Sequence, residues 1–354
     1  MKKVYILLLL ALIMPISVQT KKDKSNDKEY EKNTKWELPD PRLRIDQVHY
    51  LGSHNAFLNK HAGWIYAQQK LSVKDQLKYG VRVLEVDIGQ DGKHLSICHG
   101  SCHGTHKVLK KGKFKSFKDG VQNIAEWLKN HPNEIVILPL DNKRDTAIPA
   151  DQVDNEIASM PHVVPMVLTP NDWKPEEHDG EWPTLQWMRD HKKQIIIFNA
   201  AKGTSPKYTY YQWRYVAGTV PGTTDPEATA RLRNQSLEEQ YSSPEERAKI
   251  QRIFQMNHDT AISEQYAVDL FNVGAKVGLT GSKQKTKKIQ EKSKISDNKR
   301  STIQKCIDAC KRNNVGGGKN PNILLLDWTE KYIADNGLEQ INQWNREEAA
   351  KLAK

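Results

Sequence analysis

Short apolar runs typical of β-strands alternate with helix-like stretches along this chain, and that alternation constrains the fold more than any other feature. The first strands are expected at Val48–Leu51, Val81–Ile88, His94–Cys98 and Ile135–Leu140, with helices at Val73–Tyr79 and Phe117–Asn130. Strands that alternate with helices pair in parallel. We therefore predict an α/β fold, a distorted (β/α)8 TIM-type barrel over residues 41–335, with a C-terminal helix over residues 336–354.

Later parts of the chain carry the same signals less regularly. Further strands are expected at Val163–Leu168, Ile195–Phe198 and Ile323–Leu326, with a helix at Ser301–Arg312. Between residues 202 and 283 the pattern is weak, and either Trp213–Val216 or Ile253–Met256 could be a strand. A chain of 354 residues accommodates one barrel of roughly 250 residues without a second domain.

The N-terminus has the pattern of a secretory signal peptide. Met1-Lys2-Lys3 precedes an apolar run from Val4 to Val18, which is short for a membrane span of about 20 residues. We assign residues 1–20 to a signal peptide, with an uncleaved anchor as the alternative. Residues 21–40 are charged and almost without apolar side chains, which predicts a disordered leader. We therefore expect a secreted protein, located outside the cell or in the periplasm.

The chain is basic, with a net charge of +11 that falls to +9 when residues 1–20 and their two lysines are removed. Such a charge attracts anionic surfaces, including phospholipid headgroups, nucleic acid and cell-wall polymers. The segment Lys283–Arg300 is the most basic stretch. Its pattern is typical of a solvated loop or charged helix face, and a patch for anionic lipid or nucleic acid is the alternative.

Polar side chains stand where the predicted strands end. His54 and Asn55 follow the first strand, Glu85 and Asp87 lie late in the second, His99 follows the third and Asp141 the fourth. In barrel enzymes the carboxyl ends of the strands form the active-site face, so these side chains are expected to meet at one mouth. Carboxylates on an apolar strand are costly to bury without a cation, and Ca2+ is the natural candidate.

Five segments in this order resemble the catalytic X domain of phosphatidylinositol-specific phospholipase C, within the phospholipase C-like phosphodiesterases. They are Gly52-Ser53-His54-Asn55-Ala56-Phe57, residues 80–88, Leu95-Ser96-Ile97-Cys98-His99-Gly100, residues 130–142 and residues 184–198. The resemblance covers residues 45–200 and implies that His54 and His99 share acid and base catalysis. Histidine suits both roles because its unperturbed pKa is about 6.5.

The resemblance also implies a calcium-dependent enzyme, because Asp87 stands where metal-independent relatives have an arginine. Asn55, Glu85, Asp87 and Asp141 are the implied calcium ligands, although Asp141 is one methylene shorter than the usual glutamate. Calcium binds about 6–8 oxygen atoms, so phosphate oxygens and waters would complete its shell.

Three further residues have two interpretations each. The resemblance places Arg82 beside a ligand carboxylate that it would orient, and a direct phosphate clamp is the alternative. Lys143 either reaches the substrate phosphate or is an ordinary surface lysine. Asp327 ends the last strand, where it either accepts a hydrogen bond from His54 or caps the next helix.

The four cysteines form two Cys-x-x-x-Cys pairs, Cys98 with Cys102 and Cys306 with Cys310. Export favours disulfides, and pairing within each motif is the simplest connectivity. Similar Cys-His-x-x-Cys segments in secreted relatives support a bridge from Cys98 to Cys102. A zinc site that also uses His103 and His106 is the alternative, but its spacing matches no familiar set.

Three functions follow from these observations. The leading hypothesis is a secreted calcium-dependent phosphodiesterase that cleaves the glycerol–phosphate bond of a phosphoinositide-type lipid and forms a cyclic phosphate. The second keeps this chemistry but acts on a glycosylphosphatidylinositol anchor, a glycerophosphodiester or a teichoic-type polymer. The third is a non-enzymatic basic binder of anionic membranes. The expected partner is a phospholipid at a membrane surface; no obligate protein partner is evident, and nucleic acid is not the expected partner.

Overall fold

The computed structural model describes residues 35–62, 67–91, 94–98, 116–142, 148–203, 206–232, 241, 243–259 and 298–353. The predicted signal peptide, most of the leader and most of the basic segment Lys283–Arg300 lie outside these residues. Within the described ranges no helix is both long and apolar enough to span a bilayer.

The described residues contain eleven strands and a set of mostly short helices. The strands are β1 (Tyr50–Ser53), β2 (Val81–Leu84), β3 (Val86–Asp91), β4 (His94–Ile97), β5 (Val136–Asn142), β6 (Val167–Leu168), β7 (Ile195–Asn199), β8 (Tyr210–Tyr211), β9 (Val216–Gly218), β10 (Ile253–His258) and β11 (Ile323–Leu326). The α-helices are α2 (Val73–Lys78), α4 (Phe117–Lys129), α5 (Ala150–Ala158), α6 (Leu185–Asp190), α7 (Gln212–Tyr215), α8 (Pro226–Thr229), α9 (Pro244–Ile250), α12 (Arg300–Arg312), α13 (Thr329–Ala334) and α14 (Gly337–Lys351). Short 3-10 helices are η2 (Val164–Met166), η3 (Pro175–His178) and η5 (Val315–Gly318).

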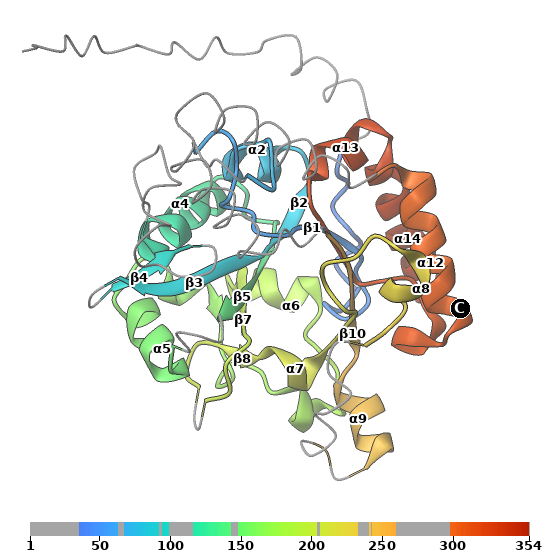
Figure 1. Cartoon of the computed structure of the whole chain (residues 1–354). Helices are drawn as coiled ribbons and strands as arrows, with labels where there is room; N and C mark the ends of the chain where they lie inside the picture. The colour runs from blue at the N-terminus through green and yellow to red at the C-terminus, as the bar shows by residue number, and fades with distance from the viewer. Residues whose placement is uncertain are drawn as a thin grey trace, which may run out of the picture.

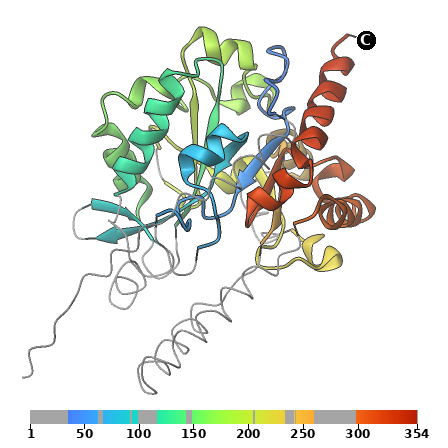
Figure 2. The same cartoon turned by 90° about the horizontal axis from the view of Figure 1, so that it is seen from above.

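Parallel ladders join the strands in the order β9-β10-β11-β1-β2-β5-β7-β8, and β6 adds to the edge of β7. Helix α7 connects β8 to β9, and no ladder between these two strands occurs in the described residues. Figure 1 shows α4 and α5 on one flank of the sheet and α12 and α14 on the other, an arrangement that Figure 2 repeats from above. The predicted distorted (β/α) barrel is confirmed.

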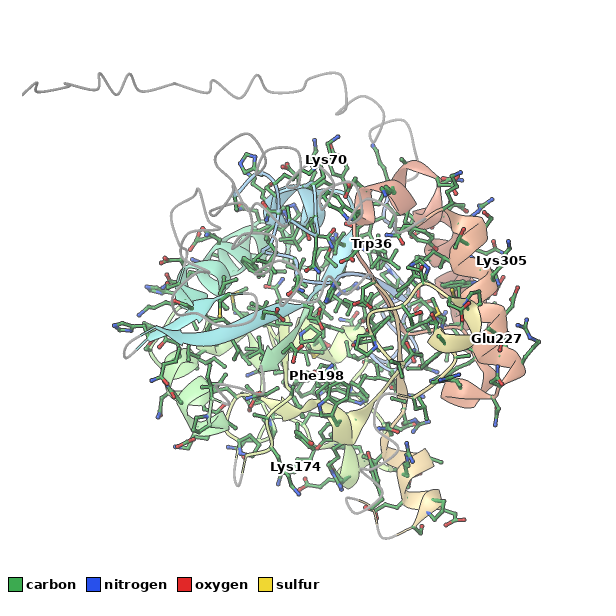
Figure 3. All side chains as sticks on the ribbon, viewed as in Figure 1. Trp36, Lys70, Lys174, Phe198, Glu227 and Lys305 are labelled. Atoms are coloured by element: carbon green, nitrogen blue, oxygen red, sulfur yellow. The ribbon has the colours of Figure 1, made fainter. Side chains whose placement is uncertain are left out.

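Side chains alternate between the two faces of the barrel strands, as a period of two requires. Ile323 and Leu325 join a cluster drawn from strands on every side of the sheet, which places them inside the barrel with Phe198. Leu324 and Leu326 belong to the cluster that packs against the outer helices. In Figure 3 Phe198 lies within the fold, whereas Lys174 and Lys305 lie toward its outside. Burying both faces accounts for the nearly continuous apolar sequence of these strands.

The hairpin of β3 and β4 corrects one prediction. The expected strand Val81–Ile88 is divided at Glu85 into β2 and β3, and β4 pairs with β3 antiparallel, so β4 is not a parallel barrel strand. Only two residues separate Asp91 from His94, and a connection this short can only join antiparallel strands. Asp91-Gly92 is the turn signal that the sequence prediction overlooked.

Other expected elements differ in extent or type. Ile253–Met256 is a strand, within β10, but Trp213–Val216 is mostly helix α7. Val163–Leu168 becomes η2 followed by the two-residue strand β6, because Pro165 has no N–H to give to a ladder. The remaining strand and helix predictions agree with the structure within about two residues at each end, except that the C-terminal helix ends at Lys351, three residues before its predicted end.

Candidate active site

His54 and Asp327 are the best-defined pair at the mouth of the barrel. They directly follow β1 and β11, whose parallel register ends with Ser53 beside Leu326. Nδ1–H of His54 donates to Oδ1 of Asp327 over 2.8 Å, and only 1% of the Asp327 side chain is exposed. Trp328 holds the N-cap position of α13, so Asp327 is not its cap. The predicted hydrogen bond is therefore present.

The other ring nitrogen of His54 faces a group of polar side chains. Nε2 lies 3.5 Å from Oε2 of Glu85, 3.7 Å from Oδ2 of Asp259 and 3.1 Å from the side-chain amide of Asn55. Burial alone would lower the pKa of His54, but the negative charges of Asp259, Glu85 and Asp327 raise this pKa well above its usual range. The carboxylates around His54 therefore stabilise its protonated form, which is the form the ring takes after it accepts a proton.

Asp259 was missed by the sequence analysis. It directly follows β10, and the N–H of Gly222 donates to its Oδ1 over 3.0 Å. The available signal was a carboxylate at the end of a strand, but the predicted strand stopped at Met256 and the pattern beyond it was weak. Parallel pairing of β10 with β11 brings the ends of both strands to the same mouth.

Asn55 connects His54 to the carboxylates. Its backbone is left-handed, with φ at +48°, a conformation that asparagine tolerates better than most residues. The side-chain amide lies 2.9 and 3.1 Å from the two carboxylate oxygens of Asp87, and its nitrogen donates to both of them. The reverse orientation would place an amide oxygen against a carboxylate, an arrangement that a hard cation stabilises.

Asp87 and Asp141 complete the cluster of carboxylates. They are register partners on β3 and β5, and they face the barrel interior because their neighbours Val86, Ile88 and Leu140 pack outward. Burial raises the pKa of Glu85 to about 7; His54 opposes this rise, and the charges of Asp141, Asp87 and Asp259 add to it. The carboxylates of Asp141, Asp87 and Asp259 thus place negative charge close to Glu85, and a cation would balance this charge.

The donor set fits calcium in its chemistry, since Asn55, Glu85, Asp87 and Asp141 offer only oxygen ligands and excess negative charge. Among the described residues, however, no three His, Cys, Asp or Glu side chains already surround a common point as metal ligands would. Side-chain rotation, including that of the Asn55 amide, would be needed to form a coordination shell.

A scan against family models matches residues 43–342 of this chain to the PI-PLC X 1 model. The chain belongs to the PI-PLC X family. A curated relative, PI-PLC X domain-containing protein 1 of Arthroderma benhamiae, is 27% identical over 190 residues, which cover 51% of this chain and 56% of that protein. A protein of the same fungus described as an uncharacterized secreted protein is 26% identical over 169 residues, covering 46% and 35% of the two chains. The chain thus spans about half or less of these relatives.

Solved structures similar to this PI-PLC X chain include two bacterial enzymes. The phosphatidylinositol-specific phospholipase C of Listeria monocytogenes superposes with a TM-score of 0.47 at 14% identity, over 85% of this chain and 95% of the other. A calcium-dependent phosphoinositol-specific phospholipase C from Pseudomonas sp gives a TM-score of 0.36 at 15% identity, over 54% and 73%.

Arg82 does not hold a ligand carboxylate in this PI-PLC X chain, which corrects the sequence prediction. Nε and Nη2 donate to the two carboxylate oxygens of Glu134 over 2.8 and 2.5 Å, and Nη1 donates to the carbonyls of Leu77 and Val81. The guanidinium also stacks between Trp36 and Trp127, 5.3 and 5.0 Å from the ring centres. The bidentate bond to Glu134 occupies the guanidinium fork of Arg82.

The cysteine predictions are corrected in part. Cys306 and Cys310 are buried free thiols on successive turns of α12. Cβ atoms four residues apart on a helix are separated by about 5–6 Å, whereas a disulfide needs about 3.5–4.5 Å. Cys98 is buried and disulfide-bonded. Its expected partner Cys102 lies outside the described residues, as do His99, His103, His106 and Lys143.

Proposed function

We propose that this chain is a secreted phosphodiesterase that cleaves the glycerol–phosphate bond of a phosphoinositide-type lipid. The observation that carries the proposal is the dyad of His54 and Asp327 at the barrel mouth, with Nε2 of His54 directed toward the carboxylate cluster. A base fixed in this way is what abstraction of a proton from a substrate hydroxyl requires. Membership of the PI-PLC X family supports the same chemistry.

The proposed reaction is an internal transfer. Nε2 of His54 takes the proton of a ring hydroxyl, whose oxygen attacks the phosphorus and forms a cyclic phosphate. The bond from phosphorus to the glycerol oxygen breaks, and His99 gives this oxygen a proton, so that diacylglycerol leaves. Asp327 holds the His54 ring in orientation and stabilises its charged form. The role of His99 rests on the family resemblance.

Calcium is the proposed cofactor, with Asn55, Glu85, Asp87 and Asp141 as the residues that would hold it. The bound ion would supply positive charge to the phosphate oxygens as negative charge develops on them. Lys143, which follows Asp141 by two residues, is proposed to contact the same phosphate. The donor chemistry and the repulsion around Glu85 support this assignment.

Secretion is proposed from the signal-peptide pattern of residues 1–20, and a curated relative carries the description of a secreted protein. The net charge of +9 that remains without those residues would draw the enzyme to anionic lipid surfaces.

The test is hydrolysis by residues 21–354 of vesicles that contain phosphatidylinositol, phosphatidylglycerol, phosphatidylcholine or a glycosylphosphatidylinositol, each with calcium and with EGTA. We expect turnover of the inositol lipid that EGTA abolishes and that His54→Asn lowers by about 10² to 10⁴. Turnover insensitive to EGTA would refute the metal assignment. Salt-sensitive vesicle binding without turnover of any phosphodiester would refute the enzyme and favour the membrane binder.

A further inference from the structure

We infer that Gln69 is a positioning residue that fixes the geometry of the His54–Asp327 dyad. The inference rests on the proposed function for its kinetic consequences, although its structural consequence can be measured separately. Gln69 is fully buried and lies between β1 and α2 in the sequence. A buried amide is costly unless its hydrogen bonds are satisfied, so its contacts show what it holds.

The amide nitrogen of Gln69 joins the ends of β1 and β11. Nε2 donates to the carbonyl of His54 over 2.8 Å and to the carbonyl of Leu326 over 2.9 Å. Leu326 immediately precedes Asp327, so this one nitrogen is hydrogen-bonded to the backbone of His54 and to the backbone of the residue before Asp327. Its two N–H groups are both used.

The amide oxygen of Gln69 holds the chain on the far side of Asp327. Oε1 accepts from the backbone N–H of Thr329 over 3.1 Å and from its hydroxyl over 3.0 Å. The carbonyl of the preceding residue, Gln68, accepts from the N–H of Trp328 over 2.8 Å. The residues on both sides of Asp327, Leu326 and Trp328, are therefore hydrogen-bonded to Gln69 and Gln68.

The dyad needs this support because both strands end there. Asn55 follows His54 and Trp328 follows Asp327, and each has a left-handed backbone with φ at +48°. The ladder of β1 and β11 thus cannot continue past the dyad in regular form. A misplacement of about 1 Å can cost a catalytic site about 10² in rate. We therefore expect the side chain of Gln69 to set the 2.8 Å bond between His54 and Asp327.

The main test replaces Gln69 with methionine, which keeps the length of the side chain and removes its four hydrogen bonds. In protein with ¹⁵N-labelled histidine, the Nδ1–H signal of His54, identified by its loss in His54→Asn, should be slow to exchange in the wild type. Gln69→Met should broaden or shift this signal and lower kcat by about 10- to 100-fold with little change in KM.

Gln194→Met is the matched control. Gln194 is also buried, and its amide nitrogen donates to the carbonyls of Leu128, His131 and Glu134, where α4 leads into β5 at the opposite end of the strand from Asp141. We expect the Gln194→Met variant to have a lower melting temperature than the wild type but an unchanged His54 signal and kcat. Thr329→Val removes one hydrogen bond to Gln69 and preserves the shape of the side chain. It should change the His54 signal and kcat in the same direction as Gln69→Met but by less, and it replaces Gln69→Met as the test if that variant does not fold.

Two results would overturn the inference. The first is a folded Gln69→Met variant whose His54 signal and kcat match those of the wild type; if Gln69→Met does not fold, the same result in Thr329→Val counts. The second is a Gln194→Met variant whose His54 signal and kcat change as much as those of Gln69→Met. If the wild type hydrolyses no phosphodiester, the proposed function fails, and the histidine signal alone still decides whether Gln69 positions the dyad.

Discussion

Asp87 and Asp141 are direct register partners on the parallel strands β3 and β5, and both side chains face the interior of the barrel. Two carboxylates brought together by a ladder repel each other, and their charges contribute to the raised pKa of Glu85. The backbone therefore enforces a concentration of negative charge that a cation would relieve. This relationship leads to the first prediction.

Calcium should stabilise the folded protein, because it would bind the folded state and not the unfolded chain. At a calcium concentration of 100 times Kd, we expect about 2.7 kcal/mol of added stability, measured as a rise in melting temperature or by calorimetric titration. Asp87→Asn and Asp141→Asn should lose most of this rise. Asp154→Asn, which changes a buried carboxylate bonded to the N–H groups of Lys207 and Tyr208, should retain it. An identical calcium response in all variants would contradict the assigned ligands.

Replacement of Asp327 by asparagine should lower kcat by about 10² to 10⁴ while the protein stays folded. An amide in place of the carboxylate removes the charge that stabilises protonated His54 and no longer fixes the tautomer of the ring. Steady-state hydrolysis of an inositol lipid measures this loss. Asp335→Asn is the control, because Asp335 accepts from the N–H of Arg300 and does not touch His54. Comparable activity of the two variants would show that the dyad is not catalytic.

Arg82→Met should reduce stability rather than catalysis. The substitution leaves Glu134 as a largely buried carboxylate without its bidentate partner, and breaking such a pair costs about 3–5 kcal/mol. Denaturant unfolding measures this loss, and the calcium affinity of the folded variant should match that of the wild type. A large fall in calcium affinity would instead support the original prediction that Arg82 orients a ligand.

Glu330 should make stability depend on pH between about 4.5 and about 6. Burial raises the pKa of this carboxyl from its ordinary value of 4.5 to about 6, with backbone N–H bonds, including that of Lys70, acting against the rise. Its contribution to stability is therefore complete below the unfolded pKa and is lost as the pH rises through 6. Glu330→Gln should be more stable than the wild type by about 2 kcal/mol at pH 7 and equal to it at pH 4. Denaturant titrations at the two pH values check this, and an equal difference at both would exclude the carboxyl as the cause.

Thiol titration should count two free cysteines in the denatured, unreduced protein. Burial raises the pKa of Cys306 to about 11 and that of Cys310 to about 12, so both should react slowly with Ellman's reagent before unfolding. Reduction should then raise the count to four, because Cys98 is disulfide-bonded. In a Cys306→Ser variant the unreduced count should fall to one. An unreduced count of zero would restore the predicted Cys306–Cys310 bridge.

Local patterns were sufficient for much of this protein. The apolar run Ile323–Leu326 predicted β11 with its bounds, and the helical spacing of Val121, Ile124, Ala125 and Leu128 predicted α4. The neighbouring places of the first and last barrel strands also followed, since closing a barrel brings them together, and the bond to His54 was one of the two roles that this placement offered Asp327. These features depend on residues close in sequence or on a general rule of the fold.

Contacts between distant segments were decided only by the tertiary structure. Arg82 forms an ion pair with Glu134 and not with a predicted metal ligand, and Asp259 lies 3.7 Å from His54. Gln69 donates hydrogen bonds to the carbonyls of His54 and Leu326. The sequence by itself determined most of the strands and most of the polar groups at their ends, because hydrophobic periodicity is local. The curvature of the sheet and the return of its loops determined which of those groups touch, because a contact between distant residues depends on how every intervening element packs.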